Sequence, residues 1–215
     1  MHSRKSADRR GMTVVLAGYA AGAAWLALHP AGATATGSAD PPTRLLIAFL
    51  LPTTAAVFLW LFSALEARRP PGVREPGDCA ATERILLRFV AFAGALHILL
   101  VLSLSDVPWI WPWPPRLAFV LVGALLVSVG NLLPTTRPNV LVGIRTPRSL
   151  RSRHFWMEIN RAGGYVAVGL GVIVIAAAVV LRQPLVGQVV CAAVLAAAGI
   201  VAARYRRLVR DSGGS

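Results

Sequence analysis

The sequence predicts an all-α polytopic membrane protein with six transmembrane helices and both termini in the cytoplasm. Hydrophobic residues make up 56% of the 215-residue chain and charged residues only 14%, whereas soluble domains carry about 25% charged residues. The apolar residues form continuous blocks, and the basic residues gather in alternate segments between the blocks. A soluble bundle is the weaker interpretation, because helices that are apolar all round have no face for water.

Each apolar block is close to the roughly 20 residues that a helix needs to cross about 30 Å of hydrocarbon. The six predicted spans are Met12–Leu28, Leu45–Leu65, Ile85–Leu104, Leu117–Leu133, Gly164–Leu181 and Leu185–Ala203. We expect two domains, a three-span half over 1–104 and a second three-span half over 105–215 that contains the loop 130–164.

The distribution of basic residues predicts the orientation. The net charge is +13, a value that alone would suggest nucleic acid. If six spans alternate, one side receives only Arg44, Arg116 and Arg182. The other side receives the basic residues of both termini, of the segment between spans two and three, and of the loop between spans four and five. The positive-inside rule places that side in the cytoplasm, and we expect no direct nucleic-acid binding.

Several polar or aromatic features lie within or beside the spans. The Gly18-x-x-x-Gly22 pattern allows a second helix to approach closely. His97, deep in the third span, is more often an interhelical hydrogen-bond partner than a metal ligand or proton relay. Trp109, Trp111 and Trp113 resemble an interfacial aromatic anchor on the external side. The alternative is a docking patch for an extracellular peptide or lipid.

The basic loop Gly130–Gly164 is the most informative stretch, because it is rich in Gly, Pro, Asn and Arg although it lies between two spans. Thr146 or Ser149 is expected to cap a helix. Over Leu150–Arg161, Phe155, Trp156 and Ile159 share one face, and Arg153, His154 and Arg161 lie opposite. This pattern predicts a short amphipathic helix in the inner headgroup layer, followed by a hinge at Gly163-Gly164. The helix either tethers the loop or forms a basic platform for a cytoplasmic protein, a lipid head group or an anionic ligand.

The loop contains Gly-Asn-x-Leu/Met-Pro, then Asn, then Gly-Ile-Arg-Thr-Pro, then Ser/Thr-Leu, then Trp and a basic residue before Gly. The residues of this pattern are Gly130, Asn131, Pro134, Asn139, Gly143, Ile144, Arg145, Thr146, Pro147, Leu150, Trp156, Arg161 and Gly163. In this pattern the loop resembles the SdpI family of bacterial membrane proteins. The chain departs from the family at two positions. Arg148 replaces a common aromatic residue, and Asn160 stands where the family often has His.

The resemblance implies a non-enzymatic, multi-pass protein of the bacterial inner membrane with no cofactor. It implies immunity to, or sensing of, a secreted membrane-active peptide toxin, and signalling by drawing a cytoplasmic transcriptional repressor to the membrane. The lipid bilayer, the toxin and the repressor are therefore the expected partners. We take the family's motif residues as the candidate functional loop and the three external tryptophans as a candidate docking site.

Two other functional classes compete with this one. A small-molecule or peptide transporter is the alternative, with Pro52, His97 and Asn131 as candidate lining residues. Against it, none of the nine acidic residues lies inside a predicted span. An enzyme is disfavoured, because no carboxylate pair, Cys/His cluster, nucleophile elbow or phosphate-binding glycine loop is present in the sequence. We therefore expect no catalytic residues and no metal site.

The orientation can be tested with topology reporters fused at three positions. We expect fusions at Pro42 and Pro112 to report the external side and a fusion at Arg148 to report the cytoplasm, because the arginine-rich loops resist translocation. Paired alkaline phosphatase and fluorescent-protein activities would measure this. The reverse pattern at all three positions would contradict the predicted orientation.

Overall fold

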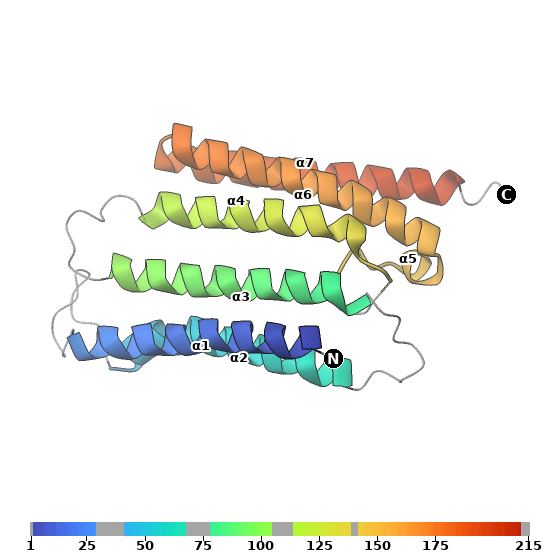
Figure 1. The fold of residues 1–215 in the computed structure, drawn as a ribbon. Helices are drawn as coiled ribbons and strands as arrows, with labels where there is room; N and C mark the ends of the chain where they lie inside the picture. Colours follow the sequence, from blue (N-terminus) through green and yellow to red (C-terminus); the bar gives the residue numbers. More distant parts are fainter. Residues whose placement is uncertain (1, 29–40, 68–77, 105–113, 139–141, 212–215) are drawn as a thin grey trace. The chain divides into compact units, whose positions relative to one another are not determined.

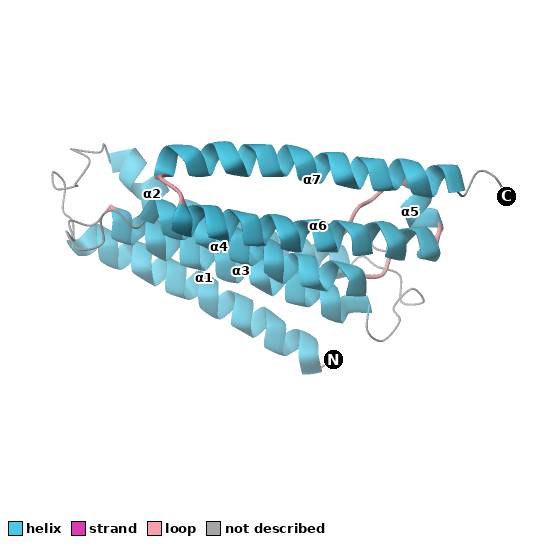
Figure 2. Ribbon diagram, turned by 90° about the horizontal axis from the view of Figure 1, so that it is seen from above, coloured by secondary structure: helices cyan, strands magenta, loops and turns pink. Residues whose placement is uncertain are grey.

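The elements in the described part of the chain are all helices, as the sequence predicts. The structure, a computed structural model, describes residues 2–28, 41–67, 78–104, 114–138 and 142–211. Within these ranges the elements are α1 (His2–Leu28), α2 (Pro41–Ala67), α3 (Asp78–Ser103), α4 (Pro114–Leu132), η2 (Leu133–Thr135), α5 (Pro147–Arg151), α6 (Arg153–Val180) and α7 (Gln183–Asp211). Figures 1 and 2 show these helices.

Six of the described helices are long and apolar enough to cross a membrane, which confirms the predicted spans. They are α1, α2, α3, α4, α6 and α7. Several extend beyond the apolar block into charged sequence: α6 begins at Arg153 and α7 continues to Asp211. The protein is therefore a multi-pass membrane protein, and the placement of its termini stays a prediction.

Residue contacts divide the chain into two compact units. One comprises Met1–Val73 and Leu86–Leu121, and the other comprises Arg74–Ile85 and Val122–Ser215. The units interleave along the chain, so that α3 and α4 each contribute residues to both. The sequence-based division into halves at residue 104 stays a prediction about domain organisation.

In the first unit, α1 and α2 pack closely through the glycines of α1. A side chain at Gly18 would place its Cβ 3.0 Å from Cγ of Pro52, and one at Gly22 would collide with the backbone carbonyl of Ala48. The two glycines of the first span therefore form the contact of α1 with α2. Small residues permit such close approach within membranes, where van der Waals packing drives helix association.

The histidine of the third span joins α3 to α1. His97 is fully buried, and its Nε2–H donates to the carbonyl oxygen of Gly18 over 3.1 Å. This confirms the interpretation of His97 as an interhelical hydrogen-bond partner. Pro52 and His97 both contact α1 at Gly18, which gives each residue a packing role.

In the second unit, α4 and α6 approach each other through two pairs of glycines. The Cβ of a side chain at Gly171 would lie 2.5 Å from the Gly123 carbonyl oxygen, and that of a side chain at Gly164 would lie 2.7 Å from the Gly130 carbonyl oxygen. The glycines are seven residues apart on both helices, so they recur on one face of each. The helix α7 then packs along α6 (Figure 1).

A glycine comparison within α6 tests this contact. Gly171→Leu should lower the free energy of unfolding by about 1–3 kcal/mol, because the new side chain meets rigid backbone. At Gly169 an added Cβ would have no neighbouring atom within 4 Å, so Gly169→Leu should be neutral or mildly stabilising through helix propensity. Thermal unfolding of the purified variants in detergent would measure both, and equal effects would refute the close contact.

Candidate functional site

The candidate site is the connection between α4 and α6 together with the end of the α6–α7 hairpin beside it. The described part of this connection contains two short elements, the 3-10 turn η2 and the single-turn helix α5. Most of the predicted motif residues fall here. Asn139 lies outside the described residues, as do the external tryptophans Trp109, Trp111 and Trp113.

The helix α5 is fixed at its start by a reciprocal cap. The Ser149 N–H donates to Thr146 Oγ1 over 3.1 Å, and the Thr146 N–H donates to Ser149 Oγ over 2.8 Å. The Ser149 hydroxyl also reaches the Ile144 carbonyl at 3.0 Å. Pro147 occupies the first turn, where its missing N–H costs nothing. The structure thus confirms the predicted cap and uses both candidate residues in it.

The amphipathic segment does not form the separate helix that the sequence predicts. A break at Ser152 ends α5, and the Ser152 hydroxyl accepts from the Phe155 N–H at 3.3 Å to start α6. From Arg153 the helix α6 then continues unbroken to Val180, through Gly163 and Gly164. The hinge predicted at these two glycines is therefore wrong. Gly163 is buried against the Ile144 side chain and Gly164 against the Gly130 backbone, and these contacts offset the low helix propensity of glycine.

The apolar face of this segment packs inside the protein. Phe155, Trp156 and Ile159 are 6%, 0% and 0% exposed. The Phe155 ring meets the Tyr205 ring of α7 edge to face, with centroids 5.7 Å apart. The expectation that this face lies in the headgroup layer is therefore also wrong, because the loop and α7 cover it.

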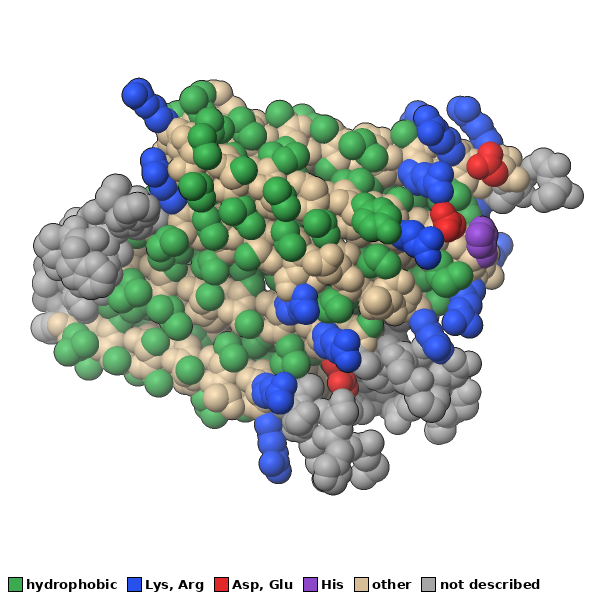
Figure 3. All heavy atoms as spheres, turned by 45° about the horizontal axis from the view of Figure 1, so that its top comes forward, with side chains coloured by type: hydrophobic (Ala, Val, Ile, Leu, Met, Phe, Trp, Pro, Cys, Tyr) green, Lys and Arg blue, Asp and Glu red, His purple; other side chains and the backbone are tan. Residues whose placement is uncertain are grey.

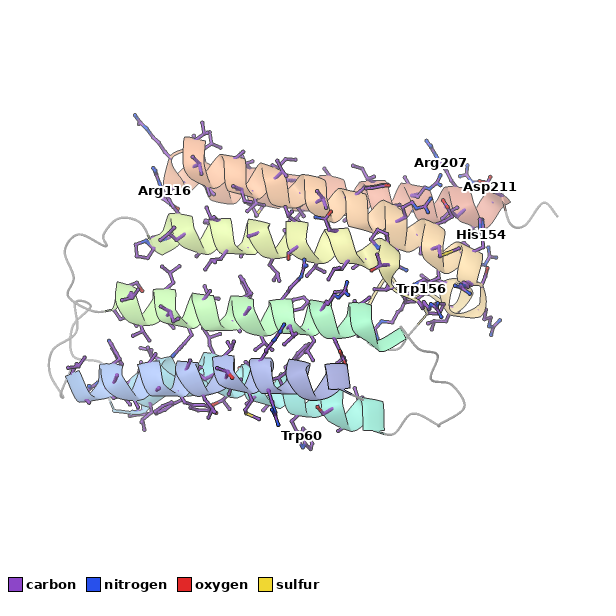
Figure 4. All side chains as sticks on the ribbon, in the orientation of Figure 1. Trp60, Arg116, His154, Trp156, Arg207 and Asp211 are labelled. Atoms are coloured by element: carbon purple, nitrogen blue, oxygen red, sulfur yellow. The ribbon has the colours of Figure 1, made fainter. Side chains whose placement is uncertain are left out.

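Trp156 joins α6 to the first part of the loop. It lies at the loop end of α6 (Figure 4), and its indole Nε1–H donates to the Thr136 carbonyl over 3.0 Å. Tryptophan combines a large apolar area with one donor, so it holds a buried carbonyl without leaving an unsatisfied group. The motif tryptophan therefore fixes the loop in place.

Asn160 joins α6 to the second part of the loop, and the sequence alone did not identify it as a site residue. Its Oδ1 accepts from the Ile144 N–H at 2.8 Å, and its Nδ2 donates to the Trp156 carbonyl at 2.9 Å. The residue is fully buried. Its position four residues after Trp156 placed both on one face of a helix, which is the signal that could have identified it.

Glycines allow the loop to lie this close to α6. Gly143 has φ +120°, and a Cβ there would lie 2.6 Å from Cζ2 of Trp156 and 2.8 Å from Oδ1 of Asn160. Only glycine suits both this backbone conformation and this space. Gly163 receives the Ile144 side chain, whose Cδ1 would lie 2.5 Å from a Cβ at that position.

The motif residues thus divide into two groups. One group fixes the conformation of the loop or packs it against α6, and it comprises Gly130, Pro134, Gly143, Thr146, Trp156 and Gly163. The other group is exposed and comprises Asn131, Arg145, Pro147, Leu150 and Arg161. Any direct recognition by the described motif residues must use the second group.

Arginines dominate the surface at this end of the second unit. Arg145, Arg148, Arg151 and Arg153 are exposed, and Arg148 donates to the Val209 carbonyl of α7 at 3.3 Å. Glu158 pairs with Arg204 at 3.0 Å and with Arg161 at 3.8 Å. Figure 3 shows basic side chains gathered around a few acidic ones at this end. Such a surface can bind carboxylates or phosphates, because guanidinium groups match both geometries.

The fold and the site define a multi-pass helical membrane protein with a basic loop that is fixed against its fifth span. Residues 135–203 match the family model described as the SdpI/YfhL protein family. The resemblance carried by the loop motif is thereby confirmed over this segment, which comprises most of the loop, α5, α6 and much of α7. No curated protein matches the chain, and no solved structure matches it.

The buried asparagine can be tested against an exposed neighbour. Asn160→Leu should lower the free energy of unfolding by about 1–3 kcal/mol, because it leaves the Ile144 N–H buried without its acceptor. Met157 is 40% exposed on the same helix, so Met157→Leu should change stability little. Thermal unfolding and protease cleavage of the loop would measure both variants, and an Asn160→Leu protein as resistant as the parent would contradict the assigned role.

Proposed function

We propose that the protein is a non-enzymatic, SdpI-like protein of the bacterial inner membrane that gives immunity to, or senses, a membrane-active peptide toxin. In this proposal the external loops meet the peptide, and the cytoplasmic loop 130–164 reports it, with a transcriptional repressor as the partner. The family match over 135–203 supports the proposal at the level of the family.

One structural observation supports a role for the loop in this proposal. Buried hydrogen bonds from Trp156 and Asn160 hold the loop in a single conformation, while Arg145, Arg148 and Arg151 remain exposed on it. A connector between two spans needs no such network. Fully satisfied buried polar contacts specify one geometry, and a fixed display of guanidinium groups suits recognition of an acidic surface on a partner.

Arg145 is the side chain best suited to test this role. It is an exposed motif residue in the Gly-Ile-Arg-Thr-Pro stretch, directly between the two residues that the packing network holds, Ile144 and Thr146. Its position is therefore fixed by its neighbours. Its guanidinium takes no part in the Trp156 and Asn160 hydrogen bonds, so its removal changes the surface charge and deletes no partner of either bond.

The prediction concerns survival of cells exposed to membrane-active peptides. Deletion of the gene should sensitise cells to at least one peptide in a panel, and the parent gene should restore growth. Arg145→Ala should restore growth at least about tenfold less well, as expected for loss of one charged contact to a partner. The minimum inhibitory concentration of each peptide would measure the effect, with protein abundance in membranes measured alongside.

Arg182→Ala is the matched control, because Arg182 lies in the turn between α6 and α7, away from the loop. It should protect as well as the parent. The proposal fails if no peptide separates the deletion strain from the complemented strain, or if both arginine variants protect fully at normal abundance.

A further inference from the structure

We propose that Arg161 and Arg204 form a binding site for the phosphate of an anionic phospholipid between the ends of α6 and α7. The inference is independent of the proposed function, because it concerns a stable lipid ligand of the second unit and needs no toxin and no cytoplasmic partner. Four properties of this surface support the proposal. The two guanidinium groups are held by one carboxylate, they lie at the predicted end of the membrane spans, exposed apolar side chains follow them along α6 and α7, and further arginines lie nearby.

The two guanidinium groups come from different helices and are held together by one carboxylate. Glu158 Oε2 lies 3.0 Å from Arg204 Nη2, and Glu158 Oε1 lies 3.8 Å from Arg161 Nη1. The side chains of Arg161 and Arg204 are 57% and 42% exposed, and that of Glu158 is 26% exposed. Each guanidinium has five donors, so one carboxylate leaves donors and one net positive charge for a further anion.

Both arginines lie at the ends of predicted apolar stretches, the depth at which lipid phosphates are expected. In α6 the apolar stretch begins three residues after Arg161, at Gly164, and in α7 it ends at Ala203, directly before Arg204. Arginines at the end of a membrane span direct their guanidinium groups to the headgroup layer. A lipid phosphate can therefore reach the pair without leaving its normal depth.

Beneath the arginines the same surface continues as an exposed apolar lane. Tyr165, Gly169 and Ile173 follow Arg161 at four-residue intervals, so they form one oblique row on α6 in which each residue is turned about 40° from the one before. Tyr165 is 69% exposed, Ile173 is 47% exposed, and Gly169 has no atom within 4 Å of where its Cβ would be. On α7, Ile200 precedes Arg204 by one turn and is 58% exposed.

This lane distinguishes a lipid from the other anions that arginines bind. An acyl chain that lies along Gly169 and Ile173 buries apolar surface while its phosphate meets the arginines. Free phosphate and an acidic peptide would use the charges alone. The adjacent side chains of α7, Arg206, Arg207 and Arg210, add positive charge, and Asp211 is the acidic exception. Figure 3 shows the basic end of these helices beside apolar surface.

The test is lipid retention by the purified full-length protein. The protein would be equilibrated in detergent with mixed phosphatidylcholine and phosphatidylglycerol, and bound lipid would be counted by native mass spectrometry. We expect preferential retention of phosphatidylglycerol. The double variant Arg161→Gln/Arg204→Gln should lower the apparent affinity for phosphatidylglycerol by roughly tenfold or more. Each arginine at the headgroup level contributes about 1 kcal/mol, and the effects of the two multiply in the binding constant.

Three variants keep the result interpretable. Arg182→Gln, at the other end of the same helix pair, should retain the lipid as the parent does. Glu158→Gln should retain it equally or more tightly, because the glutamine oxygen can still accept from a guanidinium group while a competing negative charge is removed. If the double variant does not fold, Arg161→Gln alone serves, because its side chain is the more exposed and its ion pair the longer.

Each alternative source of the anion gives a result that would overturn the proposal. Inorganic phosphate in phosphatidylcholine micelles should not raise the unfolding temperature, and a poly-glutamate peptide should not displace phosphatidylglycerol. The site is refuted if either does so, if Arg182→Gln loses as much lipid as the double variant, or if Glu158→Gln loses lipid as well. Survival in the peptide assay is a separate measurement, so the two proposals can fail independently.

Discussion

The close contact of α4 with α6 determines where the loop between them can lie. Gly130 at the end of α4 meets Gly164 at the point where α6 enters its apolar stretch, and Gly123 meets Gly171 two turns further along. Without side chains at these positions, the backbones approach until carbonyl groups and Cα atoms touch, a contact available only to very small residues. The loop therefore leaves α4 directly beside the part of α6 that carries Trp156 and Asn160, whose side chains can reach it.

Once the loop lies there, its polar backbone must be satisfied away from water. The Trp156 indole donates to the Thr136 carbonyl, the Asn160 side chain accepts from the Ile144 N–H, and the Ser149 hydroxyl donates to the Ile144 carbonyl. An unpaired buried backbone group costs about 1–3 kcal/mol, so the loss of any one of these side chains lowers the stability of the whole loop conformation. The need for these partners explains why a connection between two spans is rich in residues with specific hydrogen-bonding or backbone properties.

The spans, the α5 cap and the role of His97 could be predicted from the sequence, because each depends on local composition or on a well-defined local pairing. The outcome at Gly163-Gly164 could not, since a glycine pair suits a hinge and a tight helix contact equally well. The choice depends on Ile144 and Gly130, which are distant in sequence. The apolar face of Phe155, Trp156 and Ile159 presented the same ambiguity between lipid and protein, and here the loop and α7 provide the covering surface.

The family segment and the structural unit have different limits, which affects how the motif should be interpreted. The match begins at residue 135, whereas the glycines that receive Gly164 and Gly171 lie before it on α4. The matched segment therefore depends on α4 for its packing. Within it, Gly143, Thr146, Trp156 and Gly163 maintain the conformation of the loop, so a loss of activity on their substitution would not distinguish a lost partner contact from lost stability. The exposed motif residues, the arginines among them, take no part in these contacts, so the chemistry of recognition is best determined from them.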